Sequence, residues 1–238
     1  MPFDNTYFST HAYKDVSFAR FSQYWWSNRF YGKLVMRYGS KGSRILEIGS
    51  GLGHLVAQLE QNFIPYAIDI NHWAVIESKK VAEKTRHVVS RAEDLPYKNE
   101  AFSVIICKHV VEHLEDPAHA ILEMGRIAAM GGLLLLATPN LDSPARVWKK
   151  EKWVGYQDPT HISLKSPAEW LGLIKKAGFS IHKIFSDGFW DVPYLPHIPK
   201  IIQKYIFGSL GGLQAMLSLP FLPVKLGESI VVIARKTR

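Results

Sequence analysis

The segment with the clearest chemistry is a glycine-rich turn with two carboxylates near it. Gly49, Gly51 and Gly53 alternate with other residues directly after a short apolar run. A turn without side chains lets a ligand lie against bare backbone. Glu47 stands in that run, and Asp69 lies at the end of the next apolar run. In a parallel sheet Asp69 would lie beside the turn, where a carboxylate can accept both hydroxyls of a ribose. These residues predict a site for a cofactor that contains a nucleoside.

The elements around the turn follow from the hydrophobic pattern. Residues 45–48 are expected to form a buried strand. Apolar residues then recur at the i, i+3, i+4, i+7 spacing of a helix with one buried face, at Leu52, Leu55, Val56 and Leu59. A dinucleotide fingerprint, G-x-G-x-x-G, would need a third glycine where the chain has His54 or Val56. The turn is therefore of another type.

Its pattern, E-x-G-x-G-x-G, resembles motif I of the class I S-adenosylmethionine (SAM) dependent methyltransferases. Four further blocks follow in the family's order: Asp69 at the ribose-binding acid, RAEDLPY at the adenine-side loop, FSVIICKHVVEHLEDP at the fourth strand and GGLLLLATPN at the fifth. The chain looks closest to the small-molecule and lipid branch, which includes enzymes of quinone biosynthesis. The resemblance covers residues 25–186 and is poor over residues 187–225.

The resemblance implies SAM as the cofactor. It implies that the backbone of the turn meets the methionine and ribose parts, and that Ile70 packs on the adenine. Arg29 would bind the methionine carboxylate in a two-pronged geometry. The family often has an acid where this chain has Arg91, so Glu93 or the backbone of Ala92 would read the adenine edge. The expected cofactor-binding residues are Arg29, Glu47, Gly49, Ser50, Gly51, Gly53, Asp69, Ile70, Ala92, Glu93, Lys108 and His109.

Three histidines compete for the role of general base, which methyl transfer needs only for a hydroxyl or a protonated amine. His113, in VVEHL, matches a histidine frequent in this branch, and His161 lies in QDPTHIS, a loop where acceptors enter this fold. His109 is the third candidate. A neutral histidine titrates near working pH, so any of them could serve. We expect His161 or His113 to act on the acceptor, with His161 preferred. Because no acidic or histidine cluster has ligand spacing in the sequence, no metal is expected.

The order of the elements predicts the fold class. Strands alternate with helices from residue 44 to residue 186, which indicates a parallel sheet covered on both faces. A sixth strand over 181–186 and a last strand over 227–236 follow, and the family inserts the last strand antiparallel beside the sixth. The expected fold is α/β, a Rossmann-like seven-stranded methyltransferase sheet flanked by helices. It forms a single domain over residues 1–238, with an aromatic helical cap over residues 1–40.

Helix punctuation supports this register. Asp116-Pro117 is a cap followed by a first-turn proline, and Gly131 is expected to end that helix. The sequence SPAE at residues 166–169 is a capping box, and Gly178 is expected to end the next helix.

Residues 187–226 form an apolar insertion where the family usually has a short hairpin. Residues 205–224 carry no charge and are long enough to cross a membrane. Glycines and prolines interrupt them, however, and the chain must return to complete the sheet. We expect two short apolar helices that cover the acceptor pocket and contact one leaflet, with Lys200, Lys204 and Lys225 near anionic headgroups. A lid and a dimer contact are the alternatives.

Composition narrows the class of protein. Apolar residues make up 47% of the 238 residues, enough for a full core. The net charge of +8 suits nucleic acid, an anionic membrane or an acidic substrate, but the basic residues are scattered, so no nucleic acid is expected. The single cysteine, Cys107, excludes a disulfide framework. The N-terminus has no secretory signal, which predicts a cytoplasmic protein, peripheral on the inner face of a membrane.

The sequence therefore predicts methyl transfer from SAM to a small or lipid-like acceptor, at a hydroxyl or other heteroatom, near a membrane surface. One alternative is a nucleic-acid or protein methyltransferase. Enzymes that methylate base amines usually carry an N/D-P-P-Y/F run where this chain has CKHVVEH. The other alternative is a non-catalytic, membrane-associated binding subunit, which the intact turn and Asp69 argue against. The oligomeric state stays open.

Overall fold

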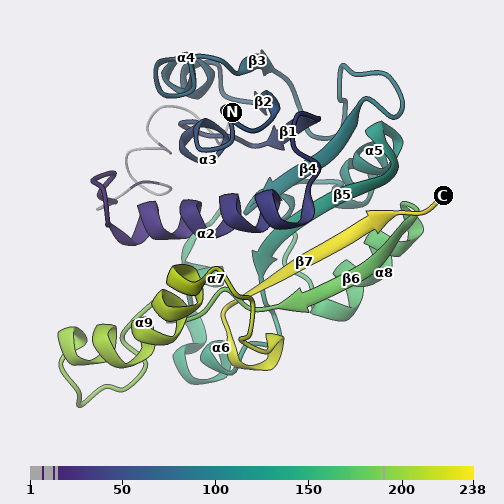
Figure 1. Cartoon of the computed structure of the whole chain (residues 1–238). Coiled ribbons are helices and arrows are strands. Elements are labelled where there is room, and N and C mark those ends of the chain that lie inside the picture. The colour runs from purple at the N-terminus through teal and green to yellow at the C-terminus, as the bar shows by residue number, and fades with distance from the viewer. Residues whose placement is uncertain (1–6, 8–12, 14–15, 190) are drawn as a thin grey trace.

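The computed structural model describes Tyr7, Tyr13, residues 16–189 and residues 191–238, and its centre is a seven-stranded sheet (Figure 1). The strands are β1 (Arg44–Ile48), β2 (Ile64–Asp69), β3 (Arg86–Val89), β4 (Phe102–Lys108), β5 (Ala128–Pro139), β6 (Phe179–Phe185) and β7 (Ser229–Lys236). Their order is β3-β2-β1-β4-β5-β7-β6, and β7 runs antiparallel to both β5 and β6 while the other neighbours are parallel. The predicted fold, including its antiparallel last strand, is confirmed.

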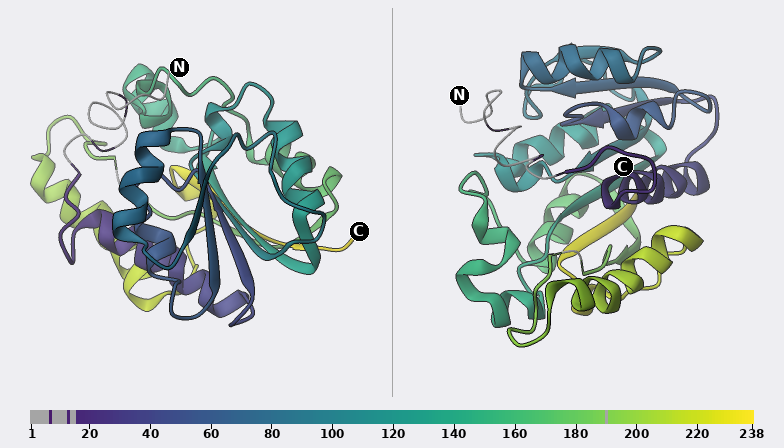
Figure 2. Two further views of the ribbon diagram at one scale, coloured as in Figure 1. Left: turned by 90° about the horizontal axis from the view of Figure 1, so that it is seen from above. Right: turned by 90° about the vertical axis from the view of Figure 1, so that its left-hand side faces the viewer.

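Helices cover both faces of the sheet, as the view from above shows (Figure 2). One layer holds α2 (Gln23–Tyr38), α3 (His54–Ala57), α4 (His72–Val81) and α9 (Lys200–Leu217), and the other holds α5 (Pro117–Ile127) and α8 (Pro167–Lys176). Shorter elements are η2 (Val111–His113), α6 (Pro144–Lys149), η3 (Lys150–Lys152), α7 (Val154–Gln157) and η4 (Val224–Leu226). Each layer buries its own apolar cluster, with Phe30 and Leu34 on the α2 side and Met124 and Trp170 on the α5–α8 side. The sheet therefore presents its loops, and not its faces, to ligands.

Two helix starts form as the sequence predicts. At α8 the Ser166 hydroxyl accepts from the Glu169 N–H, and the Glu169 carboxylate accepts from the Ser166 N–H. At α5 the Asp116 carboxylate accepts from the His119 N–H at 2.9 Å. Gly178, with φ of +87°, follows the end of α8 as expected.

Two helices end earlier than predicted. α5 ends at Ile127, because Ala128 already pairs with Phe102 at the start of β5. Gly131 therefore does not end the helix; it lies within β5, at a positive φ of +73°. α3 is only four residues long, and Leu59 is buried in the turn that follows it.

The N-terminal aromatic segment is helical over α2, where Phe30 and Tyr31 are buried. Residues 1–6, 8–12 and 14–15 of the predicted cap lie outside the described residues.

Within the described part of the insertion, residues 187–189 and 191–226, one long helix forms, α9, so the prediction of two short helices is wrong. Gly208, Gly211 and Gly212 lie inside this helix. Each glycine costs about 1 kcal/mol of helix propensity relative to alanine, a penalty that tertiary packing commonly outweighs. α9 packs against α2, and its Ala215 joins the apolar cluster on that face of the sheet. Packing, and not intrinsic propensity, decides the length of this helix.

Two buried glutamines tie α9 to the loops on either side of it. Gln203 makes four hydrogen bonds to backbone groups within residues 194–198. Gln214 accepts from two N–H groups at residues 221–222 and donates to the Ser186 carbonyl at 2.8 Å. Buried backbone groups need such partners, because water cannot reach them. The two glutamine side chains thus make the hydrogen bonds that water would otherwise make to the backbone of the loops flanking the helix.

The outward face of α9 is apolar. Its exposed apolar residues are Ile201, Ile202, Tyr205, Ile206, Leu210, Leu213, Met216 and Leu217. Among the described parts of the chain, no helix combines the length and the hydropathy needed to cross a bilayer.

Candidate active site

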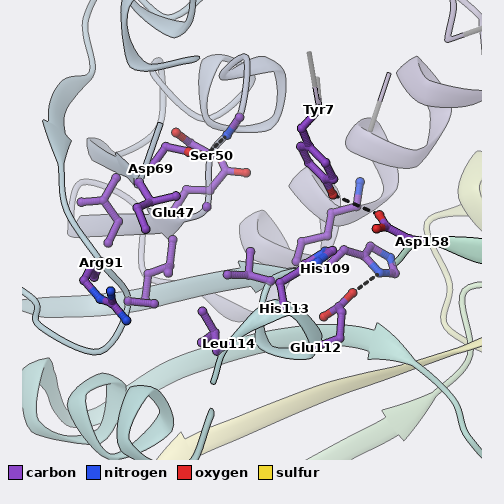
Figure 3. A pocket seen from close by; sticks show the side chains of 18 of the residues that line it. Tyr7, Glu47, Ser50, Asp69, Arg91, His109, Glu112, His113, Leu114 and Asp158 are labelled. Atoms are coloured by element: carbon purple, nitrogen blue, oxygen red, sulfur yellow. Dashed lines mark hydrogen bonds and ion pairs between the residues drawn. The ribbon is translucent and has the colours of Figure 1, made fainter. Parts of the chain in front are cut away.

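A cavity of about 1270 Å³ opens at the carboxyl edge of the parallel strands (Figure 3). Its lining comes mainly from the turn after β1, the end of β2, the loop after β3, the end of β4 with η2, and residues 154–162 of α7 and the loop after it. Side chains of α2 and of Tyr7 and Tyr13 complete the lining. Pockets for one small molecule usually measure about 300–1,000 Å³. The cavity therefore has room for a cofactor and a second small molecule.

A carboxylate and a glycine turn are bonded together at one end of the cavity. The Gly51 N–H donates to Asp69 Oδ2 at 2.8 Å, and the Asn71 N–H donates to Asp69 Oδ1 at 2.9 Å. Burial raises the pKa of Asp69, and these backbone bonds oppose the rise. A carboxylate oxygen accepts more than one hydrogen bond, so Asp69 keeps acceptor capacity for the hydroxyls of a ligand.

Two of the glycines have different jobs. Gly49 has φ of +67°, and a Cβ there would lie 2.2 Å from Val110 Cγ2, so only glycine fits. Gly49 and Ser50, two of the predicted cofactor-binding residues, line the cavity. Gly53 is not among the described residues that line the cavity. A Cβ added at Gly53 would lie 2.2 Å from Ser78 Oγ. The structure thus assigns Gly53 to the packing of α3 against α4, where the sequence predicted contact with the cofactor.

Glu47 and Lys108 place two buried ionisable groups on the cavity wall. Burial raises the pKa of Glu47 to about 8, and the nearby Lys108 ammonium opposes that rise. Burial also lowers the pKa of Lys108 to about 8. Lys108 Nζ donates to Ser27 Oγ and Asn28 Oδ1, both at 3.1 Å. Glu47 Oε2 has no hydrogen-bond partner among the described residues, which leaves a buried acceptor facing a ligand site. Lys108 is one of the cofactor-binding residues that the sequence predicts, and its side chain lies in the cavity wall.

Two predicted contributors lie elsewhere. The Arg29 guanidinium sits 5.4 Å from the ring centroid of Trp25, and Arg29 is outside the described lining of the cavity, although Asn28 is part of it. Within residues 187–189 and 191–226, no residue lines the cavity. The prediction that the insertion covers the acceptor pocket is therefore wrong, because α9 packs against α2 instead.

The loop after β3, which the sequence predicts to border the adenine, lines the cavity. Ile70, Ala92 and Glu93 all face it, and so does Arg91. Arg91 Nη2 lies 3.3 Å from Glu93 Oε1. An ion pair thus stands at this loop, where the family often has a lone acid.

Glu112 is fully buried at the other end of the cavity. Its Oε1 lies 3.2 Å from His109 Nδ1, and its Oε2 accepts from Thr138 Oγ1 at 3.0 Å. Burial opposes ionisation, but the hydrogen bond to His109 and the nearby His113 and His161 hold the pKa of Glu112 below its ordinary value. The carboxylate is therefore charged at neutral pH.

His113 and His161 meet beside Glu112, with ring centroids 4.7 Å apart. His113 Nδ1 lies 3.2 Å from the Thr160 carbonyl oxygen and 2.9 Å from Thr160 Oγ1. His161 Nδ1 donates to the Gly155 carbonyl at 2.9 Å. Burial lowers the pKa of His113. Both rings line the cavity, as does His109, so all three candidate bases are in one place.

The fold brings together a group of possible metal ligands that spacing in the sequence did not show. One carboxylate oxygen of Glu112 and one ring nitrogen each of His113 and His161 lie within 4.8 Å of one another. This cluster is not visible in the sequence, because the loop that carries His161 is far from η2 along the chain. The two segments meet only in the folded protein.

Sequence reasoning missed Tyr7 and Asp158, which also line the cavity (Figure 3). The Tyr7 hydroxyl donates to Asp158 Oδ2 at 3.1 Å, and Asp158 Oδ1 accepts from the Thr160 N–H at 2.9 Å. Asp158 stands three residues before His161 in a polar run, a signal that could have found it. Tyr7 is one of twelve aromatics in the first forty residues, and nothing in the sequence distinguishes it from the others.

The sheet order and the buried acid beside a glycine turn define the class: a SAM-dependent methyltransferase with SAM as its cofactor. Residues 21–184 match the family described as "Methyltransferase domain", and the chain belongs to that family.

The chain is also similar in sequence or in fold to individual proteins. The chain is 32% identical over 187 residues to an uncharacterised protein of Methanocaldococcus jannaschii, across 76% of this chain and 84% of that protein. It is 24% identical over 183 residues to a malonyl-[acyl-carrier protein] O-methyltransferase of Geobacter sulfurreducens, across 72% of this chain and 67% of that enzyme. A putative methyltransferase of Bacillus halodurans, solved by crystallography, has the same fold with a TM-score of 0.63, at 19% identity, covering 88% and 99% of the two chains.

Replacing Glu47 should change how stability depends on pH. The folded-state pKa of about 8 lies above the ordinary value of 4.5, so the folded state binds this proton more tightly than the unfolded state does. The proton's stabilising contribution is complete below about pH 4.5 and is lost as the pH rises toward 8. Glu47→Gln removes this titrating proton. The free energy of unfolding, measured by urea denaturation, should therefore fall between pH 5 and pH 8 by roughly 1–3 kcal/mol less in the variant than in the wild type.

The exposed Glu83 supplies the control, because Glu83→Gln should follow the wild-type pH dependence. A wild-type pH slope in Glu47→Gln would show that this carboxyl is ionised in the folded protein like any surface acid.

Proposed function

We propose that this protein transfers the methyl group of SAM to a heteroatom of a small or lipid-like acceptor that binds beside His113 and His161. The supporting observation is one cavity with the Asp69 turn at one end and the histidines at the other. When bound, SAM supplies a methyl group activated by its sulfonium, and the protein aligns the acceptor with it.

The cavity residues fit the parts of SAM. Asp69 would accept the ribose hydroxyls, while the loop at residues 91–93 would border the adenine. The Glu47 carboxylate suits the ammonium of the methionine part, since its Oε2 lacks a partner among the described residues. Lys108 suits the methionine carboxylate, a role that the sequence had given to Arg29.

The histidine end suits an acceptor that must lose a proton. The Gly155 carbonyl accepts from His161 Nδ1, so in the neutral ring Nε2 is the nitrogen that can accept a proton. His113 lies against the same ring and lines the same cavity. The Geobacter sulfurreducens relative is named as an O-methyltransferase, which agrees with an oxygen acceptor.

Removing the Asp69 carboxylate should weaken SAM binding. Asp69→Ala should cost about 2–3 kcal/mol of binding free energy, because charge-assisted hydrogen bonds to the ribose are lost. Calorimetry with SAM and with S-adenosylhomocysteine measures this, and Glu83→Gln is the surface control. Wild-type affinity in a folded Asp69→Ala protein would contradict the assignment and the proposed function together.

His161→Ala should lower turnover by roughly 10²-fold while SAM affinity stays at the wild-type value. The measurement follows labelled methyl groups from SAM into pooled quinol, phenol and lipid acceptors. His119→Ala removes an exposed histidine from α5 and should leave the rate unchanged. Equal turnover in His161→Ala and wild type would remove His161 from the acceptor site.

We further propose that α9 holds the protein at an anionic membrane surface. The helix contains no acidic residue, and its outward face is apolar. Lys200, Lys204 and Lys225 are exposed around it, and basic residues that flank an apolar helical face attract anionic headgroups. A lipid-like acceptor would then be concentrated near the enzyme.

The membrane proposal predicts that the wild-type chain sediments with vesicles that contain phosphatidylserine. Ile206→Glu with Leu213→Glu, seven positions apart on the exposed face, should lower partitioning more than about 10-fold. Leu122→Glu makes one such substitution at an exposed position of α5, on the other side of the sheet, and should have no effect. Each single α9 variant is compared with it. A wild-type chain that stays in the supernatant at low salt would rule out this use of α9.

A further inference from the structure

We propose that Glu112, His113 and His161 form a binding site for one divalent transition-metal cation. Their ligand atoms, one carboxylate oxygen and two ring nitrogens, lie within 4.8 Å of one another. All three side chains line the cavity at the end away from the Asp69 turn, where Figure 3 shows Glu112 and His113. An ion bound there would reach a molecule in the acceptor half of the cavity.

The spacing is close to that of a ligated cluster. Nitrogen and oxygen ligands sit about 2.0–2.2 Å from zinc, which places them about 3.4 Å apart in a tetrahedral site. Side-chain rotations that move the ligand atoms by roughly 1 Å would complete such a site. Backbone movement is unnecessary, because η2 and the loop at residues 158–161 already face each other through the His113–Thr160 contacts.

Each ligand side chain also has a partner that orients it. Thr138 Oγ1 donates to Glu112 Oε2, the Gly155 carbonyl accepts from His161 Nδ1, and His113 Nδ1 contacts Thr160. Metal-binding histidines nearly always use their other ring nitrogen in this way, and ligating carboxylates are hydrogen-bonded in turn. These contacts orient the three side chains. Glu112 Oε1 lies 3.2 Å from His109 Nδ1, so ligation through Oε1 would replace that contact.

The donor set selects the type of ion. Two imidazole nitrogens and one carboxylate suit zinc, manganese or iron, and leave at least one coordination position open. Magnesium prefers oxygen ligands alone. A second carboxylate adds negative charge nearby, since Asp158 Oδ2 lies 4.0 Å from His161 Nε2. The two imidazole rings thus lie between two acidic side chains, an arrangement that favours a bound cation.

The consequence for chemistry rests on the proposed function. Because all three residues line the cavity, an oxygen of the acceptor would bind the ion there, and a bound metal lowers the pKa of such an oxygen. The ion would then take over the activation that we assigned to a His161 ring nitrogen. This narrows the acceptor class to molecules that present an oxygen donor, such as a phenol, an enol or a carboxylate.

Metal binding is tested without SAM or acceptor. The full chain is stripped with a chelator, dialysed and titrated with Zn²⁺ in competition with a chromophoric chelator, with Mn²⁺ by electron paramagnetic resonance, and with Mg²⁺ as the control ion. We expect one Zn²⁺ per chain. Glu112→Gln and His161→Ala should weaken its binding at least 100-fold, Thr138→Val should weaken it about 10-fold, and His119→Ala should not change it. No stoichiometric Zn²⁺ binding, or equal binding in the Glu112 and His161 variants, would overturn the site.

SAM affinity, measured on the same variants, separates this proposal from the proposed function. Wild-type SAM binding in Glu112→Gln shows that the variant is folded. A chain that binds SAM but not Zn²⁺ overturns the metal site alone, and a chain that binds Zn²⁺ but not SAM overturns the proposed function alone. Methyl transfer that is lost on chelation and restored by Mn²⁺ supports activation by the ion. Full activity in the stripped enzyme overturns that role.

Discussion

The hydrogen bond from the Gly51 N–H to the Asp69 carboxylate is the contact on which the rest of the site depends. At 2.8 Å it joins the turn after β1 to the end of β2, and so fixes the backbone against which the cofactor lies. Gly49, in the left-handed region and closely packed on Val110, holds the same turn against the segment after β4. Three neighbouring strands are thereby brought to one point, and the cavity's shape follows from that junction.

The cavity wall also contains several buried ionisable side chains, and the fold gives only some of them a full set of hydrogen-bond or ionic partners. Buried charges are costly unless they are paired or hydrogen-bonded. Glu112 meets that condition through His109 and Thr138, and Lys108 meets it through side chains of α2. Glu47 does so incompletely, because its Oε2 has no partner among the described residues. Such local frustration is typical of binding sites, where stability is given up for affinity. A bound ligand that donates a hydrogen bond to Glu47 Oε2 would complete the partners of this side chain.

The sequence predicted what depends on local order along the chain. Strand and helix periodicity defined the sheet, and Asp69 and the glycine turn were identifiable because both directly follow apolar strands. What depends on long-range packing was not predictable. The Glu112–His113–His161 cluster forms only when a distant loop returns to η2. α9 stays one helix across its glycines because buried glutamines and α2 hold it. The Arg29 guanidinium lies over the Trp25 ring, and the sequence pattern gave no sign of this partner, which takes the place of the predicted methionine carboxylate.

A crystal structure of the protein with S-adenosylhomocysteine tests the central claim most directly, because it reports where the sulfur that carries the methyl group in SAM comes to lie. We expect the ribose hydroxyls on Asp69, the amino-acid end between Glu47 and Lys108, and the sulfur facing the space beside His113 and His161. A ligand bound outside this cavity, or a sulfur turned away from the histidines with the ribose off Asp69, would contradict the claim that the two ends of the cavity form one active site.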